Sequence, residues 1–380
     1  MDFVAIIILL GIVQGLFLGT LLVLIKSPNQ RANRIFGVLY ICFSISISHF
    51  FLDRTGLYHE FPHLFRVSFP VLFLFGPLFL LYVKVLTDRT LPLKPIHLLH
   101  ALPFALSVLA FAPFFLLPAD EKLAEVRGYE EATGVHMGLI LGLIQVLHVF
   151  AYVLAVRHEL RKYDQRIKNT KSSLEHINLR WLWIGTINFI IVFALILVMI
   201  LLQATGLNVL PIYNVAVPLS VSVVIYYMGY LGLRQPTIFS PTEELAAAAR
   251  KYEKSALTPE KGRELASRLK DFMEQYRPFL DSELTLPKLA EMLQMPPHHL
   301  SQIINESLGQ NFFDFVNAYR VEEARRLFQN PEKSAYTVLA VAEEAGFNSK
   351  TAFNSAFKKV TGQTPSEFRS QSPLPQISQN

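Results

Sequence analysis

The sequence predicts an all-α protein in which a seven-helix transmembrane bundle is followed by a water-soluble helical domain. Seven apolar runs, each long enough to cross a bilayer, lie before Gly232. After Pro236 the apolar residues recur at helical spacing among polar ones, in the pattern of two consecutive helix-turn-helix units. The composition agrees, because 52% hydrophobic residues and a mean hydropathy of +0.34 are too apolar for an ordinary soluble chain of 380 residues.

Seven predicted spans occupy residues 1–233. They cover residues 3–25, 35–52, 67–86, 97–117, 136–156, 181–203 and 209–233, and the second is the shortest. The first has neither a basic region before it nor a small-residue cleavage site, so we interpret it as a retained span rather than a signal peptide. Five prolines lie inside the third, fourth and seventh spans and predict kinks rather than helix ends; they are Pro70, Pro77, Pro103, Pro113 and Pro218.

The distribution of Lys and Arg predicts the orientation of these spans. Basic residues are frequent after spans one, three and five, and the last of these connections holds Arg157, Arg161, Lys162, Arg166, Lys168, Lys171 and Arg180. The alternate connections are poor in them. We therefore expect a multi-pass protein of the bacterial inner membrane, with the N-terminus outside and the C-terminal domain in the cytoplasm.

Polar side chains within the spans are candidate functional residues, because burying them in lipid is costly. They are Gln14, His49, Gln145, His148 and Asn188, and hydrogen bonding across the bundle is the explanation that we favour. His97 with His100, or His59 and His63 with Glu60, could bind a metal, but neither group has a further ligand at an obvious spacing. The single cysteine, Cys42, excludes an intrachain disulfide. We expect no metal and no cofactor.

Three glycines in the first span, Gly11, Gly15 and Gly19, follow one another at four-residue intervals. Such a stripe of small residues allows two membrane helices to approach closely. It would suit a dimer contact, and packing inside the same bundle explains it equally well.

The soluble part begins with a juxtamembrane linker over residues 234–258, in which residues 243–255 are predicted to be helical. A domain over residues 259–380 follows. Thr258 and Pro259 have the residue types of a helix N-cap and first turn. The apolar face of this first helix is predicted to carry Leu265, Leu269, Phe272, Met273 and Tyr276.

The first helix-turn-helix unit is predicted at about residues 285–308. Thr285 caps a helix with an apolar face, and Met295, Pro296 and Pro297 form the turn. The second helix, over residues 298–308, is predicted to place Leu300, Ile303, Ile304 and Leu308 inward. Its opposite face carries His298, Ser301, Gln302 and Asn305. Gly309 ends it, and a longer helix over about residues 313–329 follows.

The second unit, at about residues 337–360, repeats this plan. Val338, Leu339, Val341 and Ala342 are predicted to pack its first helix, and Gly346 with Phe347 forms the turn. Ser349 caps a helix that directs Phe353, Ala356, Phe357 and Val360 inward. Thr351, Asn354, Ser355 and Lys358 point outward, with Lys350 at the N-terminal end. Thr364 and Glu367 have the spacing of a capping box for a last short helix.

The outward faces of these two helices carry amides, hydroxyls and lysines. Such side chains hydrogen-bond base edges and phosphates in the major groove of DNA. An uncharged solvated face would look similar.

Residues 284–369 resemble the DNA-binding domain of AraC/XylS-type transcription regulators. The resemblance rests on Leu289-Ala290, Leu300-Ser301, Gly309, Asn311-Phe312, Asn317, Tyr319-Arg320, Ala324, Ala340-Val341-Ala342, Gly346-Phe347, Phe353, Phe357 and the run from Gly362 to Arg369. It implies seven helices whose two recognition helices enter successive major grooves, joined by the helix around Tyr319 and Arg320. It assigns base contacts to His298, Ser301, Gln302, Lys350, Thr351, Asn354 and Ser355. The seven spans differ from the soluble sugar-binding domain familiar in this family, so the resemblance implies no effector.

Charge limits the affinity expected for DNA. Residues 234–380 contain 18 basic and 18 acidic residues, so the net charge of +5 belongs to residues 1–233. Little non-specific attraction to DNA is then available to one copy. Dimerisation, or concentration on a membrane next to DNA, would have to compensate.

These observations lead us to expect a membrane-embedded transcription regulator rather than an enzyme. Its expected partners are double-stranded DNA, membrane lipid, a second copy of the chain, an unidentified small-molecule or membrane signal and, as a further candidate, RNA polymerase. A transporter or membrane enzyme with an appended regulatory domain is the alternative, opposed by the lack of buried acids, of broken-helix pairs and of any phosphate loop or nucleophile motif. Release of the soluble domain by proteolysis is a second alternative.

Overall fold

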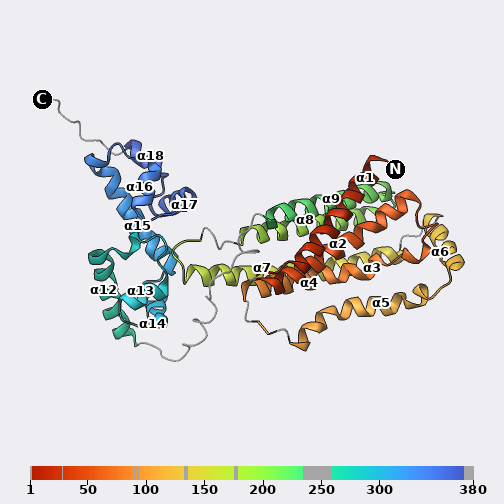
Figure 1. The fold of residues 1–380 in the computed structure, drawn as a ribbon, viewed down its shortest axis with the longest axis horizontal. Helices are drawn as coiled ribbons and strands as arrows, with labels where there is room; N and C mark the ends of the chain where they lie inside the picture. The colour runs from red at the N-terminus through yellow and green to blue at the C-terminus, as the bar shows by residue number, and fades with distance from the viewer. Residues whose placement is uncertain are drawn as a thin grey trace. The chain divides into compact units, whose positions relative to one another are not determined.

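The computed structural model describes residues 2–27, 29–88, 91–92, 94–131, 136–174, 179–233 and 258–371. Within these residues the secondary structure is helical, apart from an isolated antiparallel bridge between Lys171 and Thr285. The chain divides into two compact units (Figure 1). The first comprises Met1–Arg161 with Leu179–Thr242, and the second comprises Lys162–Asn178 with Glu243–Asn380. The second unit thus includes a segment that lies between two predicted spans in the sequence.

Seven helical stretches of the described chain are long and apolar enough to cross a membrane. They are Phe3–Leu24, Gln30–Thr55, Pro62–Thr87, Pro95–Phe115, Leu141–Lys168, Trp181–Ala204 and Leu210–Tyr230. Each overlaps one predicted span, in the same order. The second, helix α2 (Gln30–Thr55), has 26 residues and is not the shortest, because the polar residues from Gln30 to Arg34 join the helix.

Proline changes the helix type in the third and fourth stretches. Two short helices, η1 (Pro62–Leu64) and α3 (Ser68–Val71), precede a 3-10 turn, η2 (Leu72–Leu74), before α4 (Phe75–Thr87). This turn lies between Pro70 and Pro77, and Pro77 has no N–H to donate to the carbonyl of Phe73. The fourth stretch begins as 3-10 helix η3 (Pro95–Ala101) and continues as α5 (Leu102–Phe115). The helical segments nevertheless follow one another without a gap from Ser68 to Thr87 and from Pro95 to Phe115, so the prolines do not end these helices, as predicted.

Two helical segments lie where the sequence suggested connections. Helix α6 (Ala119–Glu131) follows the fourth stretch and has Asp120 and Glu121 in its first turn, where acids favour a helix. Helix α7 (His136–Lys168) continues well beyond the predicted end at residue 156, so most of the basic residues after span five lie on a helix. Helices α8 (Arg180–Ala204) and α9 (Leu210–Leu233) complete the first unit, and Pro218 lies inside α9 without ending it.

The glycine stripe of α1 (Phe3–Leu24) faces the interior of its own bundle, where α1 packs against α2 and α9. A Cβ at Gly11 would lie 2.5 Å from Ser222 Oγ of α9, and one at Gly19 would lie 2.8 Å from the carbonyl oxygen of Gly37 in α2. A Cβ at Gly15 would collide with Ser44 of α2. Internal packing therefore explains the stripe, and its interpretation as a dimer contact is wrong.

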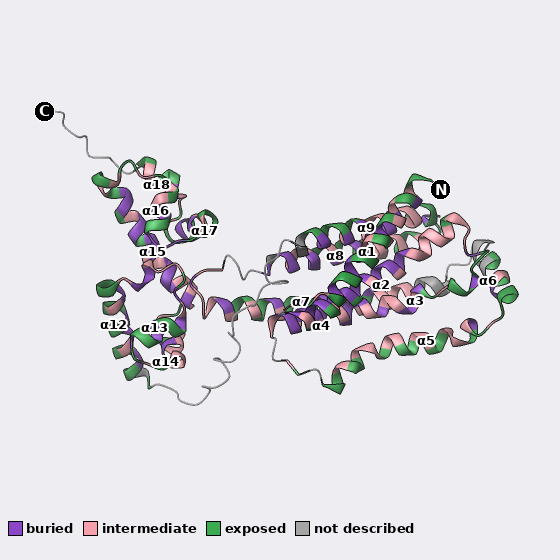
Figure 2. Cartoon of the chain, in the orientation of Figure 1, coloured by how far each residue is buried: buried purple, intermediate pink, exposed green. Residues whose placement is uncertain are grey.

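Several helices of this unit have exposed faces (Figure 2), and large apolar residues lie on them. Phe17 on α1 is 63% exposed, Leu109 on α5 is 68% exposed and Leu147 on α7 is 68% exposed. Helix α5 lies at the edge of the bundle, and of its residues Phe114 alone is buried. Exposed apolar surface of this extent is rare in soluble monomers.

Some polar residues within the spans have partners in the bundle. His49 Nδ1 lies 2.7 Å from the hydroxyl of Tyr58, and Gln145 Nε2 donates to the carbonyl of Phe69 at 3.4 Å. For these two residues the hydrogen-bonding interpretation is confirmed. His97 and His100 bond different groups, and no cluster of three potential metal ligands occurs among the described residues.

The linker over residues 234–258, with its predicted helix at 243–255, lies outside the described residues except for Thr258. The second unit then contains α12 (Pro259–Tyr276), η4 (Pro278–Leu280), α13 (Leu286–Met292), α14 (Pro297–Gln302), η5 (Ile303–Ser307), α15 (Phe312–Gln329), η6 (Pro331–Lys333), α16 (Val338–Glu344), α17 (Lys350–Thr361) and α18 (Pro365–Gln371). Helix α15 runs between the group α12–α14 and the group α16–α18 (Figure 1).

Each group has an apolar core of its own, and both cores include residues of α15. The first contains Leu269, Leu289, Ile303 and Phe312, and the second contains Val321, Val341, Phe353 and Phe357. The predicted inward positions are mostly correct. Tyr276, Leu339 and Val360 are exceptions, because they are 64%, 46% and 50% exposed.

Candidate nucleic-acid interface

The first candidate recognition helix consists of α14 and the π-helical turn η5. Leu300, Ile303 and Ile304 are fully buried, and His298, Ser301, Gln302 and Asn305 are half-buried on the other side. The two predicted faces are therefore present. The helix is not a regular α-helix over residues 298–308, because it changes at Ile303 to π-type bonding, in which the Leu308 N–H donates to the carbonyl of Ile303 at 3.0 Å.

Two of the candidate base contacts in this helix bond neighbours one turn away. Gln302 Nε2 donates to the carboxylate of Glu306 at 2.8 Å, and Asn305 Nδ2 donates to the carbonyl of Ser301 at 2.8 Å. A base edge would compete with these partners. Glu306 also adds an acid close to this surface.

The second candidate recognition helix is α17. The Ser349 hydroxyl accepts a hydrogen bond from the Ala352 N–H at 3.1 Å, as predicted for its N-cap. Phe353, Ala356 and Phe357 are buried. On the outer side Lys350, Thr351, Ser355 and Lys358 are exposed, and Asn354 is half-buried. After α17, the predicted capping box of α18 is confirmed by reciprocal hydrogen bonds between Thr364 and Glu367.

The electrostatics of this face are modest. Lys359 forms an ion pair with Asp314 at 2.7 Å, and Arg369 donates to the carbonyl of Ser334 at 2.8 Å. Two of the basic groups near α17 are thus already engaged within the domain. Lys350 and Lys358 remain the cations best placed on the outer side of α17 to meet a phosphate.

A close backbone approach joins the turn of the second helix-turn-helix unit to η4, which precedes the first unit. Gly346, in the turn of the second unit, has φ of 90°. A Cβ there would lie 2.5 Å from the carbonyl oxygen of Phe279 and 2.9 Å from the Cα of Leu280, both in η4. Only glycine combines this positive φ with the absence of a side chain.

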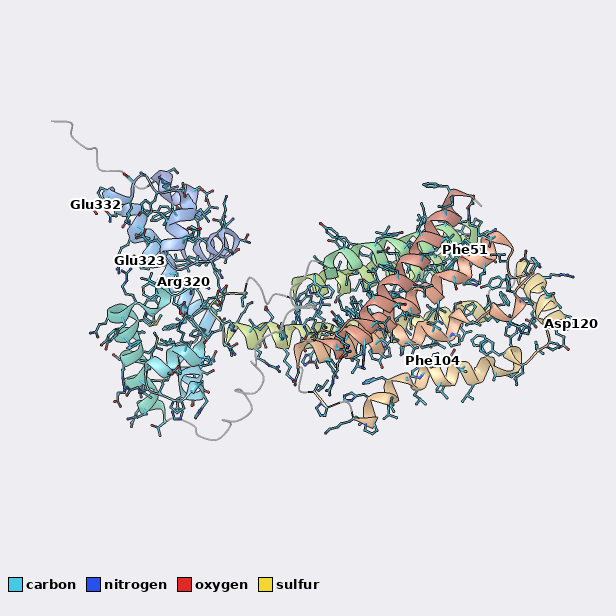
Figure 3. The ribbon with its side chains drawn as sticks, in the orientation of Figure 1. Phe51, Phe104, Asp120, Arg320, Glu323 and Glu332 are labelled. Carbon is cyan, nitrogen blue, oxygen red and sulfur yellow. The ribbon has the colours of Figure 1, made fainter. Side chains whose placement is uncertain are left out.

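Arg320, on α15, lies at the junction of the two groups of helices and is 1% exposed (Figure 3). Its Nε donates to the carbonyl of Phe279 at 2.8 Å, and its Nη2 donates to the carbonyl of Asp281 at 2.8 Å. Its Nη1 donates to Asn317 Oδ1 at 3.3 Å. Two further bonds reach Ser172, from Nη1 to the carbonyl at 3.1 Å and from Nη2 to the hydroxyl at 3.0 Å. The side chain therefore ties α15 to η4 and to the segment after α7.

Burial lowers the pKa of Arg320 to about 10, and the negative charges of Asp281 and Glu283 oppose the shift. The side chain is thus a cation at neutral pH. The sequence singled out Tyr319-Arg320 only within a family motif, and no periodicity in it indicated the contact with Ser172.

The comparisons with known proteins concern the second unit. A family model described as a helix-turn-helix domain, of AraC type, matches residues 289–371. An uncharacterized HTH-type transcriptional regulator of Staphylococcus aureus strain COL is 34% identical over 91 residues, which are 24% of this chain and 12% of that protein. The HTH-type transcriptional regulator GlxA of Rhizobium meliloti is 30% identical over 100 residues, 26% of this chain and 30% of that protein.

One solved structure is also similar, the C-terminal domain of AraT, a response regulator from Geobacillus stearothermophilus. Its sequence identity is 27% and its TM-score is 0.27, and the match covers 33% of this chain and 96% of that one. The chain spans about an eighth to a third of the length of the curated relatives named above. The C-terminal part of the chain therefore contains an AraC-type helix-turn-helix domain, and its relatives over this region are transcriptional regulators.

Proposed function

We propose that the chain is a membrane-embedded, sequence-specific DNA-binding transcription regulator, which couples a membrane or extracytoplasmic signal to gene expression. It acts from the bacterial inner membrane, with its N-terminus outside and its C-terminal domain in the cytoplasm. Its partners are double-stranded DNA, lipid, a second copy of the chain and RNA polymerase. The proposal assigns no catalytic step to it.

One observation carries this proposal: an AraC-type helix-turn-helix domain shares a chain with seven apolar helices of membrane length. The outward apolar side chains of those helices support insertion, because lipid would cover them. The alternation of Lys and Arg among the connections supports the orientation.

We propose DNA contacts on the recognition helices of both helix-turn-helix units. They are His298, Ser301, Gln302 and Asn305 in the first helix-turn-helix unit and Lys350, Thr351, Asn354, Ser355 and Lys358 in the second. Both sets lie opposite buried residues on helices of the two units. Amides and hydroxyls suit base edges, and the lysines suit phosphates.

Genome-wide mapping of the DNA bound by the intact, membrane-inserted protein tests this function. We expect the protein to bind a small number of genomic sites that have a sequence in common. Binding to these sites should be lost when Gln302 and Asn354 are both replaced by Ala. A matched variant, Ser334→Ala, changes an exposed serine of the same domain and should bind the same sites. Binding without sequence preference, or uptake of a solute by the purified protein in vesicles, would favour the transporter alternative.

A further inference from the structure

The segment that follows helix α7 pairs with the helix-turn-helix domain. Residues 169–173, which we name the strap, begin one residue after α7 ends at Lys168. The strap belongs to the second compact unit, whereas most of α7 belongs to the first. Span five, the fifth of the seven membrane-length stretches, thus continues directly into a piece of the DNA-binding unit.

The strap pairs with the start of the first helix-turn-helix unit through its backbone. Ser172 N–H donates to the carbonyl of Leu284 at 3.3 Å, and Leu286 N–H donates to the carbonyl of Thr170 at 3.0 Å. These two bonds flank the antiparallel bridge between Lys171 and Thr285. Thr285 is the N-cap of α13, so the strap lies beside the point where that helix begins.

Ser172 also reaches the buried cation at the centre of the domain. It is 1% exposed, and its hydroxyl donates to the carbonyl of Leu284 at 2.6 Å while accepting from Arg320. The hydroxyl and the backbone carbonyl of Ser172 together accept two of the five hydrogen bonds that Arg320 donates. Departure of the strap would leave buried N–H groups of a charged side chain without these acceptors, which is costly.

The next residue touches the second helix-turn-helix unit. Ser173 Oγ lies 2.9 Å from Nδ2 and 3.1 Å from Oδ1 of Asn348. Asn348 directly precedes Ser349, the N-cap of the second candidate recognition helix. Three consecutive strap residues therefore contact the first helix-turn-helix unit, α15 and the second helix-turn-helix unit.

We propose that the strap is the input element of the DNA-binding domain: docked, it holds the two recognition helices in the arrangement that binds the operator. This inference rests on the function proposed above. Because the strap follows span five in the chain, a change in that span alters DNA binding by releasing or docking the strap. Ser172 acts as a positioning residue, through Arg320, and does not itself touch DNA.

The geometry of the bridge provides a direct test. Lys171 and Thr285 form the non-hydrogen-bonded pair of an antiparallel bridge, whose Cα atoms are typically about 4.5 Å apart, within the range of a disulfide. The variant Lys171→Cys/Thr285→Cys is made in the full chain with Cys42→Ala and placed in lipid nanodiscs. We expect a disulfide to form readily on mild oxidation. Failure to form it in the folded protein would overturn the docked strap.

Binding to a mapped operator is then compared among variants. We expect Ser172→Ala to lower the affinity about tenfold, since it removes one acceptor from the buried Arg320. Ser172→Thr, which keeps the hydroxyl, and Ser334→Ala, an exposed control, should bind as the parent does. Adding the oxidised 171–285 disulfide to Ser172→Ala should restore the affinity, and reducing it should remove the gain.

Single-cysteine variants, treated with the same oxidant, control for the loss of the Thr285 cap. Equal affinity for Ser172→Ala and the parent would overturn the proposal, and so would weaker binding by the cross-linked form than by its reduced form. If the parent binds no specific site, the function proposed above fails instead, and disulfide formation still reports whether the strap is docked.

Discussion

Arg320 is a cation in the interior whose five hydrogen bonds all end on neutral oxygens. A guanidinium suits this role, because its planar fork offers donors in several fixed directions and it is more weakly hydrated than an ammonium. Each buried donor left without an acceptor would cost roughly 1–3 kcal/mol. The surroundings of Arg320 therefore favour one arrangement of α15, η4 and the strap.

Arg320→Lys should loosen this junction although it retains the charge. A lysine has three donors at a single point and cannot reach all of these oxygens. We expect faster backbone hydrogen exchange over residues 279–286 and 170–173 in the full chain, corresponding to a loss of roughly 1–3 kcal/mol in local opening energy. Arg325→Lys, at an exposed ion pair with Glu322 on the same helix, is the matched control and should leave both segments protected. Unchanged exchange in Arg320→Lys would contradict this account.

Single side chains on the recognition helices should affect DNA binding in two different ways. Gln302→Ala or Asn354→Ala removes an amide suited to a base edge, and should cost roughly 1–3 kcal/mol and relax the preference at one position of the site. Lys358→Ala removes a cation suited to a phosphate and should weaken all sequences alike. Affinities for an operator and its single-base variants separate the two outcomes. Parent-like binding by all three variants would mean that these faces do not meet DNA.

Residue burial was predictable to the extent that helical spacing decides it. Phe353 and Phe357 lie four apart and are fully buried. Val360, three residues after Phe357, lies on the same helical face but is 50% exposed, because it is in the last turn of α17, where the core of the second helix-turn-helix unit ends. Periodicity gives the direction of a side chain, whereas its burial also depends on whether another element covers it.

At the scale of elements, the existence and order of the spans were predictable from apolar length alone. The ends of these helices were less predictable. Helix α7 continues through polar residues to Lys168, because Lys and Arg favour helices as strongly as apolar straight-chain residues do, and hydropathy does not register this. The strap bridge was not predictable, since it pairs residues more than one hundred positions apart with no alternating pattern.

The contact between α1 and α2 gives a prediction at this scale. A side chain at Gly19 would lie 2.8 Å from the backbone oxygen of Gly37, and backbone cannot move aside as a flexible side chain can. Gly19→Leu should therefore destabilise the bundle by about 1–3 kcal/mol, seen as a lower melting temperature of the purified protein in detergent. Val13→Leu, on the exposed face of α1, should leave the melting temperature unchanged. A variant that dissociates dimers at an unchanged melting temperature would restore the dimer interpretation of the stripe.

At the scale of the whole molecule, the orientation of the chain in the membrane can be tested with reporter enzymes. A reporter fused after Ala124, in α6, should be active in the periplasm, and one fused after Lys168, at the end of α7, should be active in the cytoplasm. The reason is the excess of Lys and Arg in the connection after span five. Cytoplasmic activity at Ala124 would contradict the seven-span topology.

The charge balance of the whole molecule leads to the last prediction. Residues 234–380 carry 18 basic and 18 acidic residues, so few counterions are displaced when this part meets DNA. As an isolated fragment it should bind an operator weakly and with a shallow dependence on salt. A leucine zipper fused in place of the spans should make the fragment bind more tightly, because the second half-site contact becomes intramolecular, at an effective concentration of about millimolar. Its affinity should stay below that of the full chain, which also has the strap.

The control for that fusion is a zipper disrupted by proline, which leaves the fragment monomeric. Its affinity, measured by titration at several salt concentrations, should equal that of the fragment alone. Replacing the spans also removes the strap. A zipper-fused fragment that binds DNA no more tightly than the control would therefore indicate that DNA binding depends more on the hydrogen bonds between Ser172 and Arg320 than on a second copy of the domain. Nanomolar binding by the monomeric fragment in physiological salt would contradict both requirements, because neither a partner nor the membrane would then be needed to bring the domain to DNA.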